Sequence, residues 1–289
     1  MNRTHLNLAL AVVVAALGTA GWLAQRHQSA KAEKPRLTTL SPEAVTRVRI
    51  EWPGKPAIAL EKKADGWWLT EPVATRADHF EAVGATSMVS NSVSETLDST
   101  GLDLKEIGLD PPDHVVRFND VAVAFGGVEP LQQRRYMRVN GQVSLIDDPA
   151  FATLDADYSD LVAKELFGKD ETVQAIRQPA FTVTRGSNGE WTAPPGTAHA
   201  TPAALKALAE GWEGARALYN EAAPGEAPKG DAVQITLKDG TTRAFVVAAT
   251  EPQLALYAPA LHIRYVLSKA LVDTLLKLPA PKAEAAQAP

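Results

Sequence analysis

Short runs of alternating apolar and polar residues recur along the chain, and two stretches of the sequence match one another. When the sequence is shifted by 123 positions, five of the 21 aligned positions from 57 to 77 are identical: Ala57 and Ala180, Gly66 and Gly189, Trp68 and Trp191, Pro72 and Pro195, and Ala77 and Ala200. In each stretch an alternating run leads into a turn dipeptide, Asp65-Gly66 in the first copy and Asn188-Gly189 in the second. This pattern predicts one tight β-hairpin in each copy.

A helix is predicted after each hairpin. Asp78 and Glu81 have the spacing of a capping box in the first copy, and Thr201 followed by Pro202 marks the corresponding start in the second. In the first copy the cap precedes the apolar residues Phe80, Val83, Met88 and Val89 of the predicted helix. The second carries an apolar stripe at helical spacing, formed by Leu205, Leu208, Trp212, Ala215 and Tyr219. We expect this stripe to belong to the core, with its tryptophan packed rather than bound to a ligand.

The match resumes beyond the helices at a shift of 120 positions, in a series of further short strands. Turn dipeptides separate these strands, Asn119-Asp120 in the first copy and Asp239-Gly240 in the second, and Asn140-Gly141 marks another hairpin. Asp148 and Ser268 are predicted to cap a short closing helix in each copy. The predicted class is α+β, with two tandem repeats of antiparallel sheet that helices cover on one face.

The N-terminal region predicts a membrane-targeting segment. Residues 6–23 are uncharged and mostly apolar, and a run of this length favours an uncleaved anchor helix over a cleaved signal. The basic residues that follow the run favour a cytoplasmic domain, whereas the charge-light tail before it resembles the start of exported proteins. We expect export. The predicted organisation is a tail (1–5), the anchor helix (6–23), a basic linker (24–36), the first repeat (37–167), the second repeat (168–278) and a disordered tail (279–289).

Composition and motifs point away from several kinds of chemistry. The net charge is -5, without the concentrated basic region that nucleic-acid binding requires. The sequence has no cysteine, which excludes disulfides and a thiol nucleophile. Its six histidines are never three or four residues apart, as two zinc ligands on one helix would be, and no glycine-rich phosphate loop is present. We therefore predict no catalytic residue, no metal and no cofactor.

Two groups of acidic residues have alternative interpretations. The first could supply oxygen ligands to calcium, but it lacks the spacing of an EF-hand loop, and helix caps with a solvated helix face explain it better. It comprises Asp147, Asp148, Asp155, Asp157 and Asp160. The second, Glu61, Glu71 and Asp78, could contain a glycosidase pair, which needs only two carboxylates about 5–10 Å apart. A chain with 34 acidic residues contains such pairs by accident.

Two features are candidates for contact with a partner. Trp67 and Trp68 point to opposite faces of a strand, and Trp68 matches Trp191 and is predicted for the core. Trp67 is then predicted to be exposed, where it could anchor a partner unless a loop shelters it. The second candidate is a contact loop between two predicted strands, for which a rigid structural turn is the alternative. Its candidate residues are Leu102, Ile107, Leu109, Pro111 and Pro112.

Several stretches of the first copy resemble a known family. They are LTTLSPEAVTRVRIE at 37–51, LEKKADGWWLTEP at 60–72, IGLDPP at 107–112, AFGG at 124–127 and RRYMRV at 134–139. Over residues 37–166 the chain resembles the bacterial domain-of-unknown-function family 4340, and the second copy does so more weakly. The resemblance implies a membrane-anchored protein, some of whose relatives are encoded beside gliding-type ABC exporters. It implies no catalytic residues, because none are established for the family.

These observations predict a non-enzymatic interaction module on the extracytoplasmic (periplasmic) face of the bacterial inner membrane. It would span the membrane once, and the resemblance adds ABC transporter subunits as partners. The alternative is a secreted or periplasmic protein that binds or modifies cell-envelope polysaccharide, including as a hydrolase. The sequence does not indicate an oligomeric state.

Overall fold

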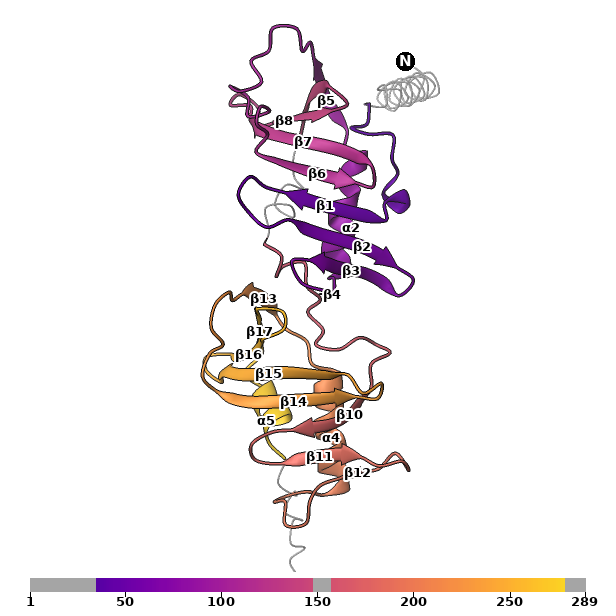
Figure 1. Ribbon diagram of the computed structural model, residues 1–289, viewed down its shortest axis with the longest axis vertical. Coiled ribbons are helices and arrows are strands. Elements are labelled where there is room, and N and C mark those ends of the chain that lie inside the picture. The colour runs from indigo at the N-terminus through magenta and orange to yellow at the C-terminus, as the bar shows by residue number, and fades with distance from the viewer. Residues whose placement is uncertain (1–34, 148–156, 279–289) are drawn as a thin grey trace, which may run out of the picture.

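The computed structural model describes residues 35–147 and 157–278, and it contains two antiparallel sheets that follow one another along the chain (Figure 1). The first sheet has nine strands in the order β4-β3-β2-β1-β6-β7-β8-β9-β5, and the second has eight in the order β12-β11-β10-β14-β15-β16-β17-β13. In both, the strands before the helix lie at one edge, the strand after the helix lies at the opposite edge, and the last four strands lie between them. The predicted antiparallel α+β class is confirmed.

The elements of the first sheet region are η1 (Pro42–Ala44), β1 (Arg47–Glu51), β2 (Ile58–Lys63), β3 (Gly66–Glu71), β4 (Thr75–Arg76), α2 (His79–Ser87), η2 (Met88–Ser90), β5 (Val93–Leu97), β6 (His114–Phe118), β7 (Val121–Val128), β8 (Arg135–Val139) and β9 (Gln142–Ile146). Those of the second are β10 (Val173–Arg177), β11 (Thr182–Arg185), β12 (Trp191–Thr192), α4 (Pro202–Glu213), β13 (Tyr219–Ala222), β14 (Asp231–Leu237), β15 (Thr242–Ala249), β16 (Leu254–Ala258), β17 (Ile263–Leu267) and α5 (Leu271–Leu276). We call residues 35–147 the first unit, 157–168 the connector and 169–278 the second unit.

Both predicted helix starts are confirmed by their caps. The Asp78 carboxylate accepts hydrogen bonds from the first backbone N–H groups of α2, and the Thr201 hydroxyl accepts one from Ala204 N–H in α4. The predicted stripe of α4 is buried as far as Trp212 and Ala215. Its extension to Tyr219 was wrong, because α4 ends at Glu213 and Tyr219 lies in strand β13 with 43% of its surface exposed.

The predicted turns lie between strands as expected. Asn119-Asp120 joins β6 to β7, and Asn140-Gly141 joins β8 to β9 with positive φ at both residues, as a type I′ hairpin turn requires. Asp239-Gly240 joins β14 to β15. The second closing helix is α5, but the predicted cap at Ser268 was wrong, because α5 begins at Leu271 with Ala270 at its N-cap position and has no side-chain cap. The first closing helix, predicted after Asp148, lies outside the described residues.

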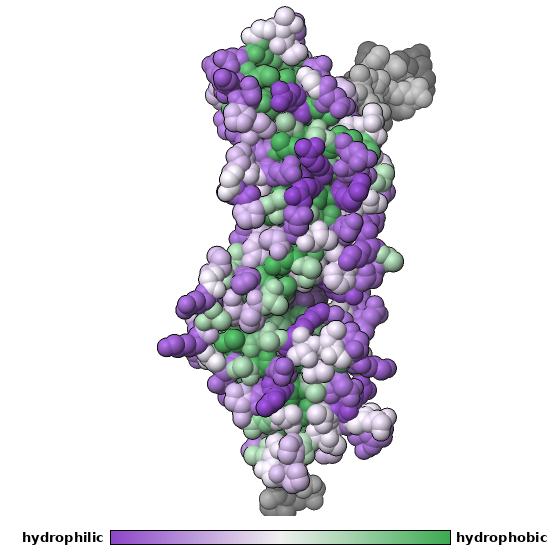
Figure 2. All heavy atoms as spheres, viewed as in Figure 1, coloured by the Kyte–Doolittle hydropathy of each residue, from purple (hydrophilic) through white to green (hydrophobic). Residues whose placement is uncertain are grey.

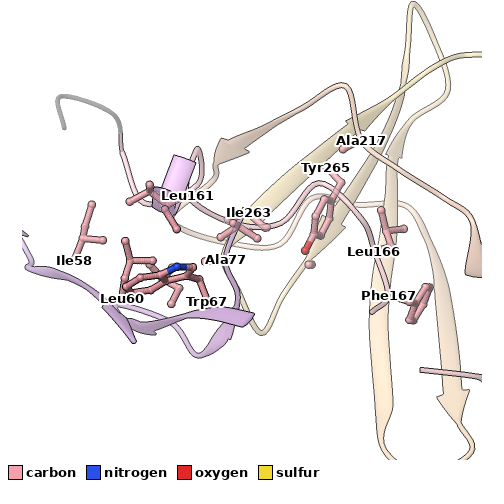
Figure 3. Close-up of a cluster of buried hydrophobic side chains, with 14 of the residues drawn as sticks. Ile58, Leu60, Trp67, Ala77, Leu161, Leu166, Phe167, Ala217, Ile263 and Tyr265 are labelled. Carbon is pink, nitrogen blue, oxygen red and sulfur yellow. The ribbon is translucent and has the colours of Figure 1, made fainter. Parts of the chain in front are cut away.

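The connector packs against both units and joins their cores. Ala77 beside β4 pairs with Val162 of the connector, and Leu166 N–H donates to Ala215 O of the second unit at 3.1 Å. Figure 3 shows the apolar side chains that meet here, with Trp67 and Ala77 from the first unit near Leu161 of the connector. Hydrophobic residues also reach the surface near this junction (Figure 2).

Polar contacts fix the connector at the same place. The Tyr158 hydroxyl donates to the carbonyl oxygens of Leu261 and His262 at 3.1 and 2.9 Å. The buried Asn220 amide of β13 donates to Ser159 O and Val162 O at 3.3 and 2.8 Å. Because the two Asn220 bonds are buried, breaking one would leave a buried polar group unpaired. The connector therefore holds the two units together as a joint.

No helix in the described part of the chain has the length and apolar character needed to cross a membrane. The anchor predicted at residues 6–23 lies outside the described residues, as do the tails predicted at 1–5 and 279–289.

Candidate partner-binding surface

The predicted contact loop between β5 and β6 is compactly folded. Leu104 O accepts hydrogen bonds from Leu109 N–H and Asp110 N–H at 2.7 and 3.1 Å. The Asp103 carboxylate accepts one from Lys105 N–H at 2.9 Å. The loop thus forms its own short-range hydrogen bonds, as compact surface loops do.

The same loop is docked tightly on strand β7. Gly127 N–H donates to Ile107 O at 2.9 Å. A Cβ atom at Gly126 would lie 2.5 Å from Ile107 O, and Gly108 has φ +70° and would bring a Cβ 2.9 Å from Gly127 N. Only glycine allows this approach of two backbones. The IGLDPP and AFGG stretches therefore fold against each other, which supports the rigid-turn interpretation of this segment.

This docking decides which contact-loop residues are accessible. Leu109 is fully buried, so its prediction as a partner contact was wrong: the approach of the loop to β7 encloses its side chain. Pro111 is exposed, and Leu102, Ile107 and Pro112 are half-buried. These four remain predicted contacts.

Trp67 was also wrongly predicted as an exposed contact. It is 6% exposed and belongs to the core cluster. Trp68, which was predicted for the core, lies on the opposite, open face of β3, so that prediction was wrong as well. There the Trp68 indole N–H donates to the Asp65 carboxylate at 3.0 Å, and the Lys63 ammonium lies 4.4 Å from the centre of the indole ring.

The error comes from the turns of the two hairpins. In the first, Lys63 pairs with Gly66, so this glycine already belongs to strand β3. In the second, Gly189 N–H donates to Gly186 O inside the turn, and the strand begins later, at Trp191. The two aligned glycines therefore occupy different places. A shift of one residue moves every side chain to the other face of the sheet.

Sequence reasoning missed the most exposed large apolar residue of the described chain, Leu131, which is 89% exposed in the loop between β7 and β8. The buried Glu129 carboxylate accepts hydrogen bonds from Leu131 N–H and Gln132 N–H, both at 3.0 Å. The donation from Gln132 is the main reason that the pKa of Glu129 lies below its usual value. The Arg134 guanidinium lies 3.5 Å from the Glu129 carboxylate and 3.0 Å from the Glu95 carboxylate.

Leu131 is therefore held out to solvent by an ordered loop. This loop adjoins the contact loop. Gly127 N–H donates to Ile107 O of the contact loop, and the next residue, Val128, is 44% exposed and leads into the Leu131 loop. We call this area the loop surface; it comprises Leu102, Ile107, Pro111, Pro112, Val128 and Leu131. The only sequence signal for its tip was the Glu129-Pro130 pair at the end of a strand.

Two of the three acidic residues weighed as a glycosidase pair, Asp78 and Glu71, have structural partners. Asp78 is buried, caps α2 and lies 3.6 Å from Lys164 of the connector. Glu71 accepts from Arg49 at 2.8 Å on the open face of the first sheet. Within the described ranges no three His, Asp or Glu side chains are grouped to hold a metal ion, while Asp148 and Asp155 of the other acidic group lie outside these ranges.

A family model described as a domain of unknown function (DUF4340) matches residues 67–223, more than half of the chain. The match runs from β3 through the connector to the end of β13, and it confirms the resemblance found in the sequence. No curated protein and no solved structure matches the chain.

Proposed function

Since the chain belongs to the DUF4340 family, whose function is unknown, we propose that it is a non-enzymatic interaction module. In this proposal it is anchored in the bacterial inner membrane with its two sheets on the extracytoplasmic side, and it is an accessory component of an ABC-type export system. The observation that carries the proposal is the loop surface, where Leu131 projects from a loop that Glu129 holds in place.

A fixed, exposed leucine suits partner binding for an energetic reason. Binding through a mobile loop costs the entropy of ordering that loop, whereas a preorganised loop avoids most of this cost. A few apolar anchors at the centre of an interface supply most of its binding energy. Leu131 has the exposure and the ordered setting of such an anchor.

The proposed anchor explains how a modest contact area would suffice. Confinement of the module to the membrane raises its effective concentration near a membrane-embedded partner. The genomic neighbourhood implied by the family resemblance supplies the partner class, the subunits of an ABC exporter.

The test is co-purification of the tagged full-length protein from membranes in mild detergent, followed by mass spectrometry. We expect ABC transporter subunits with the wild type, their loss with Leu131→Asp, and their retention with the matched control Leu218→Asp. Leu218 is 52% exposed in the second unit. Recovery of the wild type without transporter subunits, or retention of the subunits by Leu131→Asp, would overturn the proposal.

A further inference from the structure

A cavity of about 540 Å³ opens at the joint between the two units. The first unit contributes one wall, the second unit the other, and the connector lies between them. The lining residues are Trp52, Lys55, Pro56, Ile58, Pro72, Val73, Asp157, Tyr158, Pro224, Gly225 and His262. We call this cavity the joint groove. A largely apolar cavity between two packed units is a common location for a binding site.

Several residues that line the joint groove have restricted side chains. Three of the lining residues are prolines, and Tyr158 and Trp52 contact neighbouring groups. The Tyr158 hydroxyl is bound to two carbonyl oxygens of the second unit, and the Trp52 ring lies 6.0 Å from the His114 ring. Because these side chains are already positioned, a ligand would not have to order them on binding.

Charge is unevenly distributed around the groove. The connector side carries Asp157, and Asp160 lies three residues further along the chain. Burial raises the pKa of Asp160, and the negative charge of Asp157 raises it further. On the first-unit wall the Lys55 ammonium lies 5.9 Å from the centre of the Trp52 ring. A cationic group of a ligand is therefore favoured beside the connector and disfavoured beside Lys55.

We propose that the joint groove binds an extended, proline-rich peptide segment of a partner protein, with a lysine or arginine of that segment beside Asp157. Proline-rich segments adopt the polyproline II helix, which loses little conformational entropy on binding and docks in grooves lined by aromatic residues. The pyrrolidine rings would pack on Trp52 and Tyr158, between the prolines of the two walls. This site is separate from the loop surface and does not depend on the proposed exporter.

Fluorescence anisotropy of a labelled synthetic peptide tests the proposal with the full-length protein in detergent. The probe is Lys-Pro-Pro-Ala-Pro-Pro-Ala-Pro-Pro. One control peptide carries glutamate in place of lysine, and another carries glycine in place of every proline. We expect saturable binding of the probe, weaker binding of the glutamate peptide and no measurable binding of the glycine peptide.

Variants of the groove sharpen the test. Val73→Arg should block the groove and abolish binding, and Asp157→Lys should weaken it. Lys55→Glu should tighten binding about two- to five-fold, in the range of a solvent-exposed charge pair. Such a gain cannot come from misfolding. The matched control is Asp120→Lys in the β6–β7 turn, whose side chain is 96% exposed and outside the groove, and it should leave binding unchanged.

Three results of the peptide assay would overturn the proposal. They are the absence of saturable binding to the wild type, equal binding of the lysine and glutamate peptides, and binding that survives Val73→Arg. Self-association of the full-length protein that Val73→Arg abolishes would assign the groove to a second copy of the chain, and would overturn it as well. Because the peptide assay involves no transporter, its failure is distinguishable from failure of the exporter proposal.

Discussion

The two sheets share one strand order, yet their helices fill the cores in different ways. In the second unit α4 buries Trp212 completely, and its indole N–H donates to Leu275 O of α5 at 3.0 Å. In the first unit α2 buries the small residues Ala82 and Ala85 and leaves Phe80 79% exposed. The same topology therefore accepts a helix whose aromatic residue is buried, as in the second unit, and one whose aromatic residue is exposed, as in the first.

The connections that follow the edge strands β5 and β13 also differ between the two units. The first unit has a long loop between β5 and β6, and this loop docks on β7 to form the loop surface with Leu131. The corresponding connection of the second unit, between β13 and β14, contributes Pro224 and Gly225 to the joint groove instead. Two copies of one scaffold thus present different surfaces, because the strand order constrains the core far more than it constrains the loops.

The largest expected effect concerns the two helices. Trp212→Ala should lower the free energy of unfolding by about 3–5 kcal/mol, because it removes a fully buried aromatic side chain and leaves a cavity. Phe80→Ala should change it by no more than about 0.5 kcal/mol, as expected for a surface position. Urea denaturation of both variants measures the difference. Equal losses would show that α2 and α4 have the same packing role.

The next effect concerns the docking of the contact loop. Gly126→Ala should destabilise the protein by about 1–3 kcal/mol, because the added methyl group meets the Ile107 carbonyl. Gly127→Ala is the matched control, since its Cβ would lie 3.6 Å from the same oxygen. Hydrogen exchange should accelerate over residues 107–113 in Gly126→Ala alone. Unchanged exchange there would mean that the loop does not depend on this contact.

The smallest effect concerns the Leu131 loop and pH. The pKa of Glu129 is lower in the folded protein than in the unfolded chain, chiefly through the bond from Gln132 N–H. The ionised carboxylate therefore stabilises the loop fully above its usual pKa of 4.5, and this contribution is lost as the pH falls through the lower folded-state value. The protection factors for hydrogen exchange at Leu131 and Gln132, taken relative to the intrinsic rate at each pH, should fall in that acidic range.

Glu129→Gln provides the control for this pH effect. The amide cannot ionise, so exchange at Leu131 should be faster than in the wild type at neutral pH and should lack the acid-induced step. A variant that retains the step would show that another group is responsible.

Features set by neighbouring residues were predictable from the sequence. The cap at Asp78 and the turn at Asn140-Gly141 each depend on a few adjacent residues, whose side-chain and backbone preferences are readable directly. The repeated order of strands and helices was predictable for the same reason, since it follows from a series of such local signals.

Features set by distant residues, by the exact position of a turn or by the organisation of a loop were not predictable. The burial of Leu109 depends on the approach of Ile107 to Gly126, which lies in another strand. The face occupied by Trp67 depends on where its hairpin turn closes, and one residue decides between core and solvent. Leu131 became a candidate only once Glu129 was seen to organise its loop.

Site-specific cross-linking tests the central claim, that the loop surface of the first unit is the partner contact. The natural chain has no cysteine, so Leu131→Cys introduces a single thiol into the full-length protein. In intact cells a membrane-impermeant maleimide cross-linker should react at this position and give an adduct that contains an ABC transporter subunit. Leu218→Cys in the second unit should be labelled without such an adduct. No adduct from position 131, or the same adduct from both positions, would contradict the claim.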